Sequence, residues 1–247
     1  MIAAIAGKDL RRLFTSPLAW AVLFFLQVIL AWIFLTRMQA FLDLQPQIAV
    51  MPAAPGLTEL VVAPTFGTAT IILLMVVPLL SMRLIAEERR NQTLPFLMSA
   101  PVSITQIVLG KFLALLAFLA LAVGLIVLMA LSLYAGGKLD LGLLAGNVLG
   151  LLLLCASFAA VGLYLSCLTS QPLVAGVGTF AVLLGLWLVN LSASDPDSAL
   201  HLLSLIKHYE SFAKGTIALN DLVYYLVLIA LFLLLSIRRL DGDRLRT

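Results

Sequence analysis

Charged residues are scarce in this sequence, and their scarcity bounds its class. Asp, Glu, Lys and Arg make up 11% of the 247 residues, whereas soluble domains average about 25%. Hydrophobic residues make up 63%, and the mean hydropathy is +1.15. This composition excludes an ordinary globular protein, a disordered tail and a nucleic-acid-binding domain. At about 20 residues for each membrane-spanning helix, the chain has room for roughly six.

Side chains that carry chemistry are rare where a membrane enzyme would need them. The long apolar runs hold no carboxylate and no histidine, and His201 and His208 both lie in the last external loop. Cys155 and Cys167 lack the spacing of metal ligands and are interpreted as packing residues. The carboxylates of that loop are irregularly spaced, so no metal site is expected. Proton relays and ion-coupled transport are disfavoured, and a membrane-embedded enzyme is the most distant alternative.

The nucleotide-binding motif G-x-x-x-x-G-K-[ST] is absent as well. Its nearest approach is Gly110-Lys111, which is followed by Phe112 and has Thr105 in place of the first glycine. We therefore expect that the chain does not bind ATP through this motif, is not an enzyme and holds no cofactor of its own. Energy for work across a membrane must then come from a partner.

What the sequence does contain is a series of apolar runs. The runs without any charged residue are 13–36, 60–82, 112–137, 141–194 and 222–237. The fourth is long enough for two helices, and the polar stretch from Thr169 to Pro172 divides it. The sequence predicts an all-α membrane protein with a single transmembrane domain over residues 1–247. The predicted spans are residues 18–36, 65–82, 112–135, 141–166, 173–191 and 222–237.

The basic residues are distributed unevenly between the two sides of these spans. Eleven fall on the side of the N-terminus, namely Lys8, Arg11, Arg12, Arg83, Arg89, Arg90, Lys111, Arg238, Arg239, Arg244 and Arg246. The other side holds four, namely Arg37, Lys138, Lys207 and Lys214. Because Lys and Arg accumulate in cytoplasmic loops, both termini are predicted to be cytoplasmic, in a multi-pass protein of a bacterial inner membrane.

Residues 1–16 have the pattern of an amphipathic helix. Apolar residues recur at helical spacing from Ile2 to Leu13, while Lys8, Arg11 and Arg12 share the opposite face. Asp9 intrudes on the apolar face. The pattern predicts an interface helix on the cytoplasmic membrane surface. Plain positive-inside anchoring is the alternative explanation of the three basic residues.

The cytoplasmic loop 83–107 carries two acids directly followed by two bases, Glu87-Glu88-Arg89-Arg90. Acids contribute little to membrane orientation, so topology does not explain them. A short helix that docks on another protein through complementary charge does. A solvated charged loop is the alternative.

Small and polar residues inside the spans are interpreted as packing devices. Gly142, Gly146 and Gly150 form a double G-x-x-x-G that lets a neighbouring backbone approach closely. Packing within the chain is favoured, and a subunit interface is the alternative. Interhelical hydrogen bonds are predicted for the strongest polar groups in the spans, Gln27, Asn147 and Asn190. Contact with a substrate is the alternative.

The two long external loops differ in pattern. Residues 37–64 contain four prolines, which predict an extended excursion rather than a helix. Residues 192–221 have apolar residues at helical spacing and predict a re-entrant or interfacial amphipathic helix. Asp195 or Ser198 is expected to cap its start, and Gly215 is expected to end it.

Several segments resemble the ABC-2 type permeases, and within them the gliding-motility-type branch. They occur in the family's order and extend over most of the chain. They are Lys8–Pro17, Glu87–Leu94 with Ser99–Ser103 and Gly110-Lys111, Leu165–Gln171, and His208-Tyr209 with Phe212, Gly215 and Asp221–Tyr224. Two positions depart from the family pattern: Gln92 stands where many relatives have Gly, and Pro95 stands where they have an acid.

The resemblance implies a half-transporter. It pairs with a second permease chain, identical or different, and with two cytoplasmic ATPase subunits that bind ATP and Mg. Glu87, Glu88 and Arg89 would then sit in a groove of the ATPase, whose closure would tilt the spans. The implied ATPase-coupling interface comprises Glu87, Glu88, Arg89, Arg90, Thr93, Lys8, Asp9, Arg11, Arg12, Thr169 and Gln171. The implied external gate comprises His208, Tyr209, Phe212 and Gly215.

The function implied is that of a permease subunit that couples a partner's ATP hydrolysis to export of a cargo. Uncharged spans suit a lipidic or amphiphilic cargo better than a free ion. The alternative is a mechanotransmission or scaffold subunit, which passes ATP-driven motion to periplasmic or envelope proteins without transport. The expected partners are the ATPase, the second permease chain, the lipid bilayer and, on the alternative, a periplasmic accessory protein; nucleic acid is not among them.

Overall fold

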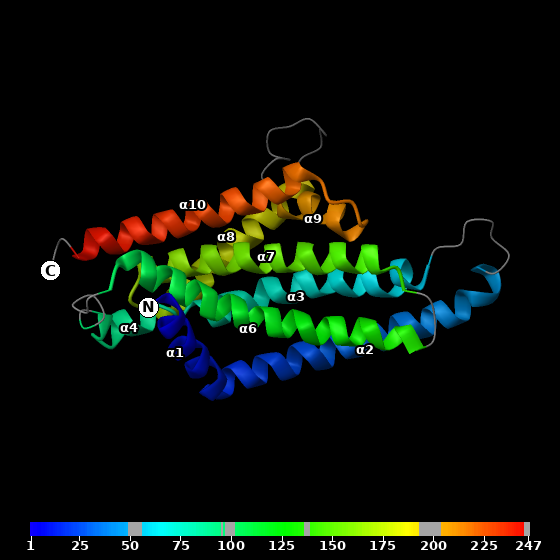
Figure 1. Ribbon diagram of the computed structural model, residues 1–247, viewed down its shortest axis with the longest axis horizontal. Helices are drawn as coiled ribbons and strands as arrows, with labels where there is room; N and C mark the ends of the chain where they lie inside the picture. The colour runs from blue at the N-terminus through cyan, green and yellow to red at the C-terminus, as the bar shows by residue number, and fades with distance from the viewer. Residues whose placement is uncertain (49–55, 95, 97–101, 136–138, 193–203, 245–247) are drawn as a thin grey trace.

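The computed structural model describes residues 1–48, 56–94, 96, 102–135, 139–192 and 204–244. In these ranges the chain is helical and has no strand (Figure 1). The elements are α1 (Ile2–Thr15), α2 (Pro17–Ile48), η1 (Thr58–Val62), α3 (Ala63–Ser81), α4 (Ala86–Arg90), α6 (Ile104–Ser132), η2 (Leu133–Ala135), α7 (Leu141–Leu168), α8 (Pro172–Ser192), α9 (Leu205–Ala213) and α10 (Leu219–Arg244).

Six helices of the described ranges are long and apolar enough to cross a membrane. They are α2, η1 continued by α3, α6, α7, α8 and α10. The all-α architecture with six spans that the charge-free runs predict is thus confirmed. Helices are also what a bilayer demands, because a helix satisfies its own backbone hydrogen bonds.

The helices extend beyond the predicted spans at several ends. Helix α6 begins at Ile104, eight residues before the predicted start, because Ser103 and Gln106 form a capping box. Helix α10 continues through Arg238 and Arg239 to Arg244. A charged residue marks the edge of an apolar run, but it does not end a helix.

The prediction of an extended chain over residues 37–64 is wrong for most of that loop. Helix α2 continues to Ile48 with Pro46 inside it, and Thr58–Val62 forms a π-helical turn that leads into α3. Pro64 is the second residue of α3, where η1 passes into α3. Residues 49–55 lie outside the described part of the chain.

Helix α7 lies at the centre of the bundle. It packs against α3, α6, α8, α9 and α10, and in Figure 1 it runs between α10 on one side and α3 and α6 on the other. Close approach to α3 depends on Gly162, because a Cβ there would clash with the Ser81 side chain. Glycine at this position therefore sets the spacing of the two helices.

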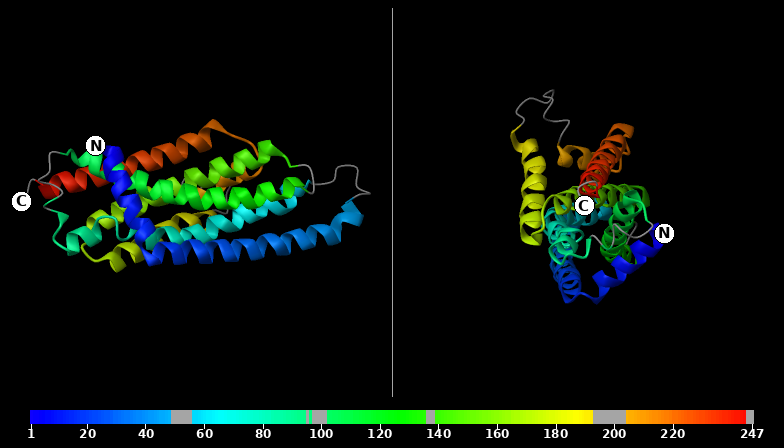
Figure 2. Two further views of the ribbon diagram at one scale, coloured as in Figure 1. Left: turned by 60° about the horizontal axis from the view of Figure 1, so that its bottom comes forward. Right: turned by 90° about the vertical axis from the view of Figure 1, so that its left-hand side faces the viewer.

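Two ends of the bundle can be distinguished. We call the charged end the one where α1, α4, the start of α6, the α7–α8 turn and the end of α10 gather (Figure 1). The N-terminus lies there too. At the opposite end lie η1 and the start of α7, with α9 beside it. Helix α1 crosses the charged end at an angle to the spans (Figure 2) and packs mainly on α6.

The amphipathic helix predicted for residues 1–16 is present as α1. Its apolar face reaches α6 at Gly110, where a Cβ would lie 2.7 Å from Ile5 Cγ2. Ser16 then adopts an extended conformation and Pro17 opens α2, which turns the chain between the two helices.

Interhelical hydrogen bonds are confirmed for two of the three polar residues in the spans. Gln27 Nε2 on α2 lies 2.7 Å from Met129 Sδ on α6. Asn147 Nδ2 on α7 donates to the carbonyl oxygen of Ala213 at 3.3 Å. The side chain of Asn190 lies outside the described part of the structure. Cys155 and Cys167 are both free and buried, as the packing interpretation predicts.

Candidate coupling site

One hydroxyl group near the end of α7 forms hydrogen bonds with the backbone at the start of helix α4. Ser166 Oγ accepts hydrogen bonds from the backbone N–H groups of Ile85 and Ala86, both at 3.0 Å, and donates to the carbonyl oxygen of Met82 at 3.2 Å. Ser166 is fully buried. A single side chain thereby supplies the partners that the turn between α3 and α4 lacks.

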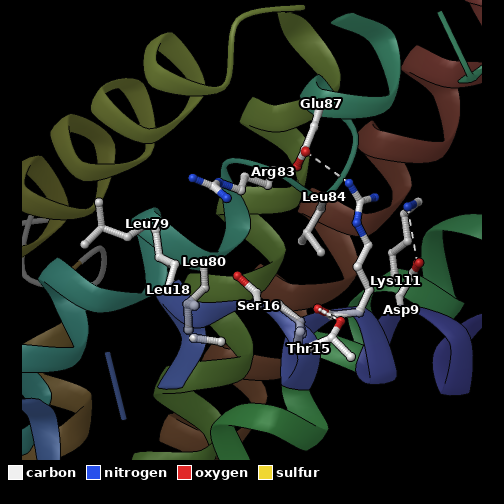
Figure 3. Close-up of a pocket in the computed structure, with 13 residues that line it drawn as sticks. Asp9, Thr15, Ser16, Leu18, Leu79, Leu80, Arg83, Leu84, Glu87 and Lys111 are labelled. Carbon is white, nitrogen blue, oxygen red and sulfur yellow. Dashed lines mark hydrogen bonds and ion pairs between the residues drawn. The ribbon is translucent and has the colours of Figure 1, made fainter. Parts of the chain in front are cut away.

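A buried ionic cluster joins α1, α4 and α6. Lys111 Nζ on α6 lies 2.7 Å from Glu88 Oε1 on α4 and 3.2 Å from Asp9 Oδ2 on α1. Lys111 is 1% exposed, Asp9 5% and Glu88 7%. Figure 3 shows Lys111 and Asp9 facing each other. We call Asp9, Glu88 and Lys111 the ionic clamp. Buried charges persist only when paired, so the clamp explains why an acid lies on the apolar face of α1.

Two ion pairs at the edge of the site extend these attachments. Arg12 on α1 contacts Glu87 on α4 at 3.1 Å. Arg89 Nη2 donates to Asp243 Oδ2 on α10 at 2.5 Å and to the carbonyl oxygen of Cys167 on α7 at 2.8 Å. The Arg12–Glu87 pair is partly exposed, and such pairs contribute about 1 kcal/mol or less. The partly buried Arg89 pair ties the end of α10 to the same short helix.

The structure divides the predicted coupling residues into two groups. Asp9, Glu88 and Arg89 point into the protein and have partners within the chain. Intrachain contacts occupy the charged groups of Glu88 and Arg89. That these two residues sit in a groove of another protein stays a prediction. The residues with exposed surface at this end are Lys8, Arg11, Arg12, Arg90, Thr93 and Gln171, while Glu87 and Thr169 are half-buried.

Sequence reasoning missed three residues of the site: Lys111, Ser166 and Asp243. Lys111 entered only the orientation argument and the family resemblance, because a lysine at the edge of a span usually reaches for water. A signal for it was nevertheless present. Asp9 on an apolar helix face requires a buried cation, and Lys111 is the basic residue at the start of the third run. Ser166 and Asp243 carry no comparable signal, since their partners follow from the fold alone.

Gln92, which follows α4, adopts a left-handed backbone conformation with φ of +56°. Glycine adopts this conformation without strain, in agreement with the family pattern that the resemblance implies. Because the left-handed region costs a residue with Cβ about 1–2 kcal/mol, we expect Gln92→Gly to keep or raise stability, by up to about 1 kcal/mol. Gln92→Val should lower it by about 1 kcal/mol or more, since a β-branched residue fits this region worst. Thermal unfolding of the two variants in detergent checks the contrast, and equal stability would contradict it.

At the opposite end of α7, two glycines of the G-x-x-x-G motif pack against α9. A Cβ on Gly150 would lie 2.6 Å from Phe212 Cβ, and one on Gly146 would lie 2.9 Å from the Phe212 carbonyl oxygen. A Cβ on Gly142 would meet only the side chain of Asp140. Packing within the chain, the favoured interpretation of the motif, is thus confirmed for Gly146 and Gly150.

Helix α9 is the amphipathic helix predicted within residues 192–221. Ser204 caps its start by accepting from Lys207 N; the caps expected, Asp195 and Ser198, lie outside the described residues. Gly215 follows its end with φ of +75°, as predicted. Tyr209 and Phe212 are buried against α7, and burial raises the pKa of Tyr209, so its phenol stays neutral.

His208, a residue of the implied external gate, is held by contacts with α10. Its Nδ1 lies 2.6 Å from Asp221 Oδ1, and its ring stacks on Tyr224 with centroids 4.0 Å apart. Tyr225 Oη donates to the Leu205 carbonyl oxygen at 2.9 Å. Within the described part of the chain, no three His, Cys, Asp or Glu residues lie together as a metal site would require. Asp195, Asp197 and His201 lie outside it.

A comparison with models of protein families identifies the family of this chain. The model of the ABC-2 family transporter protein matches residues 3–244, which is nearly the whole chain. The chain belongs to the ABC-2 transporter family. It is accordingly a membrane-spanning permease subunit of an ABC transporter, and the family generally works as a dimer with an ATPase partner. No curated protein matches the chain.

Proposed function

We propose that the charged end of this ABC-2 permease faces the cytoplasm and receives the ATPase on the exposed surface of α1 and α4. Eleven of the fifteen basic residues belong to this side of the spans, which supports the orientation. We further propose that the chain itself is no enzyme, and that the ATPase alone binds ATP and Mg.

The observation that carries this proposal is the number of attachments on one short helix. Helix α4 is bound to α7 through Ser166, to α6 through Lys111 and to α10 through Asp243. A displacement of α4 by the ATPase would therefore reach three spans at once, because closely packed interiors transmit movement rather than absorb it. Glu87 and Arg12 add α1 to the same unit.

Reversing one exposed charge beside the clamp tests the docking surface. Arg90 is exposed on α4 and forms no ion pair with a described residue, so Arg90→Glu should leave the fold intact. We expect it to lower recovery of the ATPase about tenfold in a pull-down from mild detergent, because charge complementarity guides such contacts. Lys214→Glu, an equally exposed charge at the opposite end, is the control. Equal recovery with both variants would contradict the proposed surface.

For the cargo we propose export of a lipidic or amphiphilic molecule, and for the lineage the gliding-motility-type branch. Spans without a charged residue support the first. The segments from Lys8 to Pro17 and from Glu87 to Leu94 support the second. The second permease chain is either a copy of this one or a related chain.

A second candidate function is mechanotransmission without transport, and the contacts of helix α7 favour it. The same helix holds α4 through Ser166 at the charged end and α9 through Gly146 and Gly150 at the opposite end. Movement of α4 would thereby reach an external surface. ATP-dependent accumulation of a labelled lipid in vesicles supports export. A stably bound external protein with no such accumulation supports mechanotransmission.

A further inference from the structure

A cavity of about 280 Å³ opens at the charged end between α1, the start of α2, the end of α3 and α4 (Figure 3). One part of its lining is apolar and includes Leu18, Leu79 and Leu80. Another part is polar and includes Ser16 and Arg83. In Figure 3 the Arg83 side chain lies between those of Glu87 and Leu79. The cavity is therefore amphiphilic.

The charges around the cavity are paired with one exception. Arg12 contacts Glu87. Lys111 contacts both Asp9 and Glu88, and Lys8 Nζ lies 3.6 Å from Asp9 Oδ1, so the two carboxylates of the clamp face two ammonium groups. Arg83 is exposed and forms no ion pair with any described residue. The lining thus has a net charge of +1, carried by Arg83, and it attracts an anion.

The position of the cavity indicates what kind of anion fits. Helix α2 begins at Pro17 and α3 ends at Ser81, so the cavity lies where two apolar spans meet the charged end. This is the depth of lipid headgroups. Leu79 is 45% exposed on the outer face of α3, so an acyl chain can continue from the cavity along the bundle surface. A small soluble anion would leave this apolar part unused.

We propose that this cavity binds the headgroup of an anionic membrane phospholipid. The phosphate lies on the Arg83 guanidinium and the Ser16 hydroxyl, and an acyl chain packs against Leu18 and Leu79. Because Arg12 and Glu87 line the same cavity, the headgroup lies beside the pair that joins α1 to α4. A bound lipid therefore contacts α1 and α4, the helices that the ATPase displaces in the proposed function.

Lipid retention measured by native mass spectrometry tests this proposal on the full chain in detergent. The probes are phosphatidylglycerol and phosphatidylcholine with identical acyl chains. One basic side chain near a membrane surface favours an anionic lipid about fivefold, so phosphatidylglycerol should be retained about fivefold more. Arg83→Gln should abolish this preference, and Arg83→Lys should keep it.

Arg11→Gln is the matched control, since Arg11 is exposed on α1 but does not line the cavity; it should keep the preference. Equal retention of the two lipids by the unmodified chain, or equal losses in Arg83→Gln and Arg11→Gln, would overturn the proposal. Competition by glycerol phosphate at the same strength would mean that the site recognises free phosphate, which also overturns it. The measurement needs no ATPase, so its failure is distinct from failure of the proposed function.

Discussion

Lys111→Met is expected to lower the free energy of unfolding by about 3–5 kcal/mol, because removing one member of a buried ion pair leaves the others unpaired. Asp9 and Glu88, both nearly inaccessible to water, would lose the ammonium group that lies 3.2 and 2.7 Å from them. Helices α1 and α4 should detach from α6, and any ATP hydrolysis should lose its coupling. Unfolding in detergent, followed by helical signal, measures the loss.

The control for this variant removes the whole clamp. Combining Lys111→Met with Asp9→Leu and Glu88→Met leaves hydrophobic side chains of similar size, and hydrophobic replacement of a buried ion pair is often neutral or stabilising. We expect this triple variant to regain most of the lost stability. If Lys111→Met alone unfolds at the same temperature as the unmodified chain, the clamp does not hold the site together.

Gly150→Leu is expected to separate α9 from α7, which is the second large effect. Even a Cβ at this position would lie 2.6 Å from Phe212 Cβ and 3.0 Å from its Cγ. Overpacking of this kind typically costs about 1–3 kcal/mol. The atoms in the way, Phe212 Cβ and Cγ, cannot move aside easily because the ring is held between two helices. We therefore expect a loss of unfolding free energy at the upper end of this range.

Hydrogen exchange over Leu205–Ala213 measures the separation, and α9 should lose protection in Gly150→Leu. Gly124→Ala in α6 is the control, since nothing lies within 4 Å of a Cβ built there; it should leave the exchange of α9 unchanged. Unchanged protection of α9 in Gly150→Leu would contradict the packing described for Gly146 and Gly150.

The sequence predicts the positions of the spans well, because a membrane span requires a continuous apolar run and such a run is visible in the local sequence. It predicts their ends poorly. Lys111 breaks an apolar run, yet it lies inside α6 because its charge is neutralised by Asp9, 102 residues away along the chain. Pro46 and Pro64 indicate a loop, yet both lie in helices. A proline near a helix end disturbs few hydrogen bonds, and no local pattern gives its position relative to that end.

For the candidate site, too, the sequence predicts the segment but not its contacts. The run Glu87-Glu88-Arg89-Arg90 marks the correct segment, since charges there have no role in topology. Which of them point outward depends on Lys111, Cys167 and Asp243 from three other helices, and this follows only from the fold. Gly146 and Gly150 were predictable as packing residues because a G-x-x-x-G face has one physical use inside a membrane. Their partner, Phe212, was not.

Photochemical cross-linking from position 90 tests the central claim most directly. A photoreactive amino acid in place of Arg90, on the exposed side of α4, should cross-link the permease to its ATPase in native membranes after illumination. The same amino acid in place of Lys214 should not. The account predicts an ATPase adduct from position 90 alone. An adduct from position 214, or none from position 90 while the ATPase still co-purifies, would place the ATPase elsewhere and contradict the role given to α4.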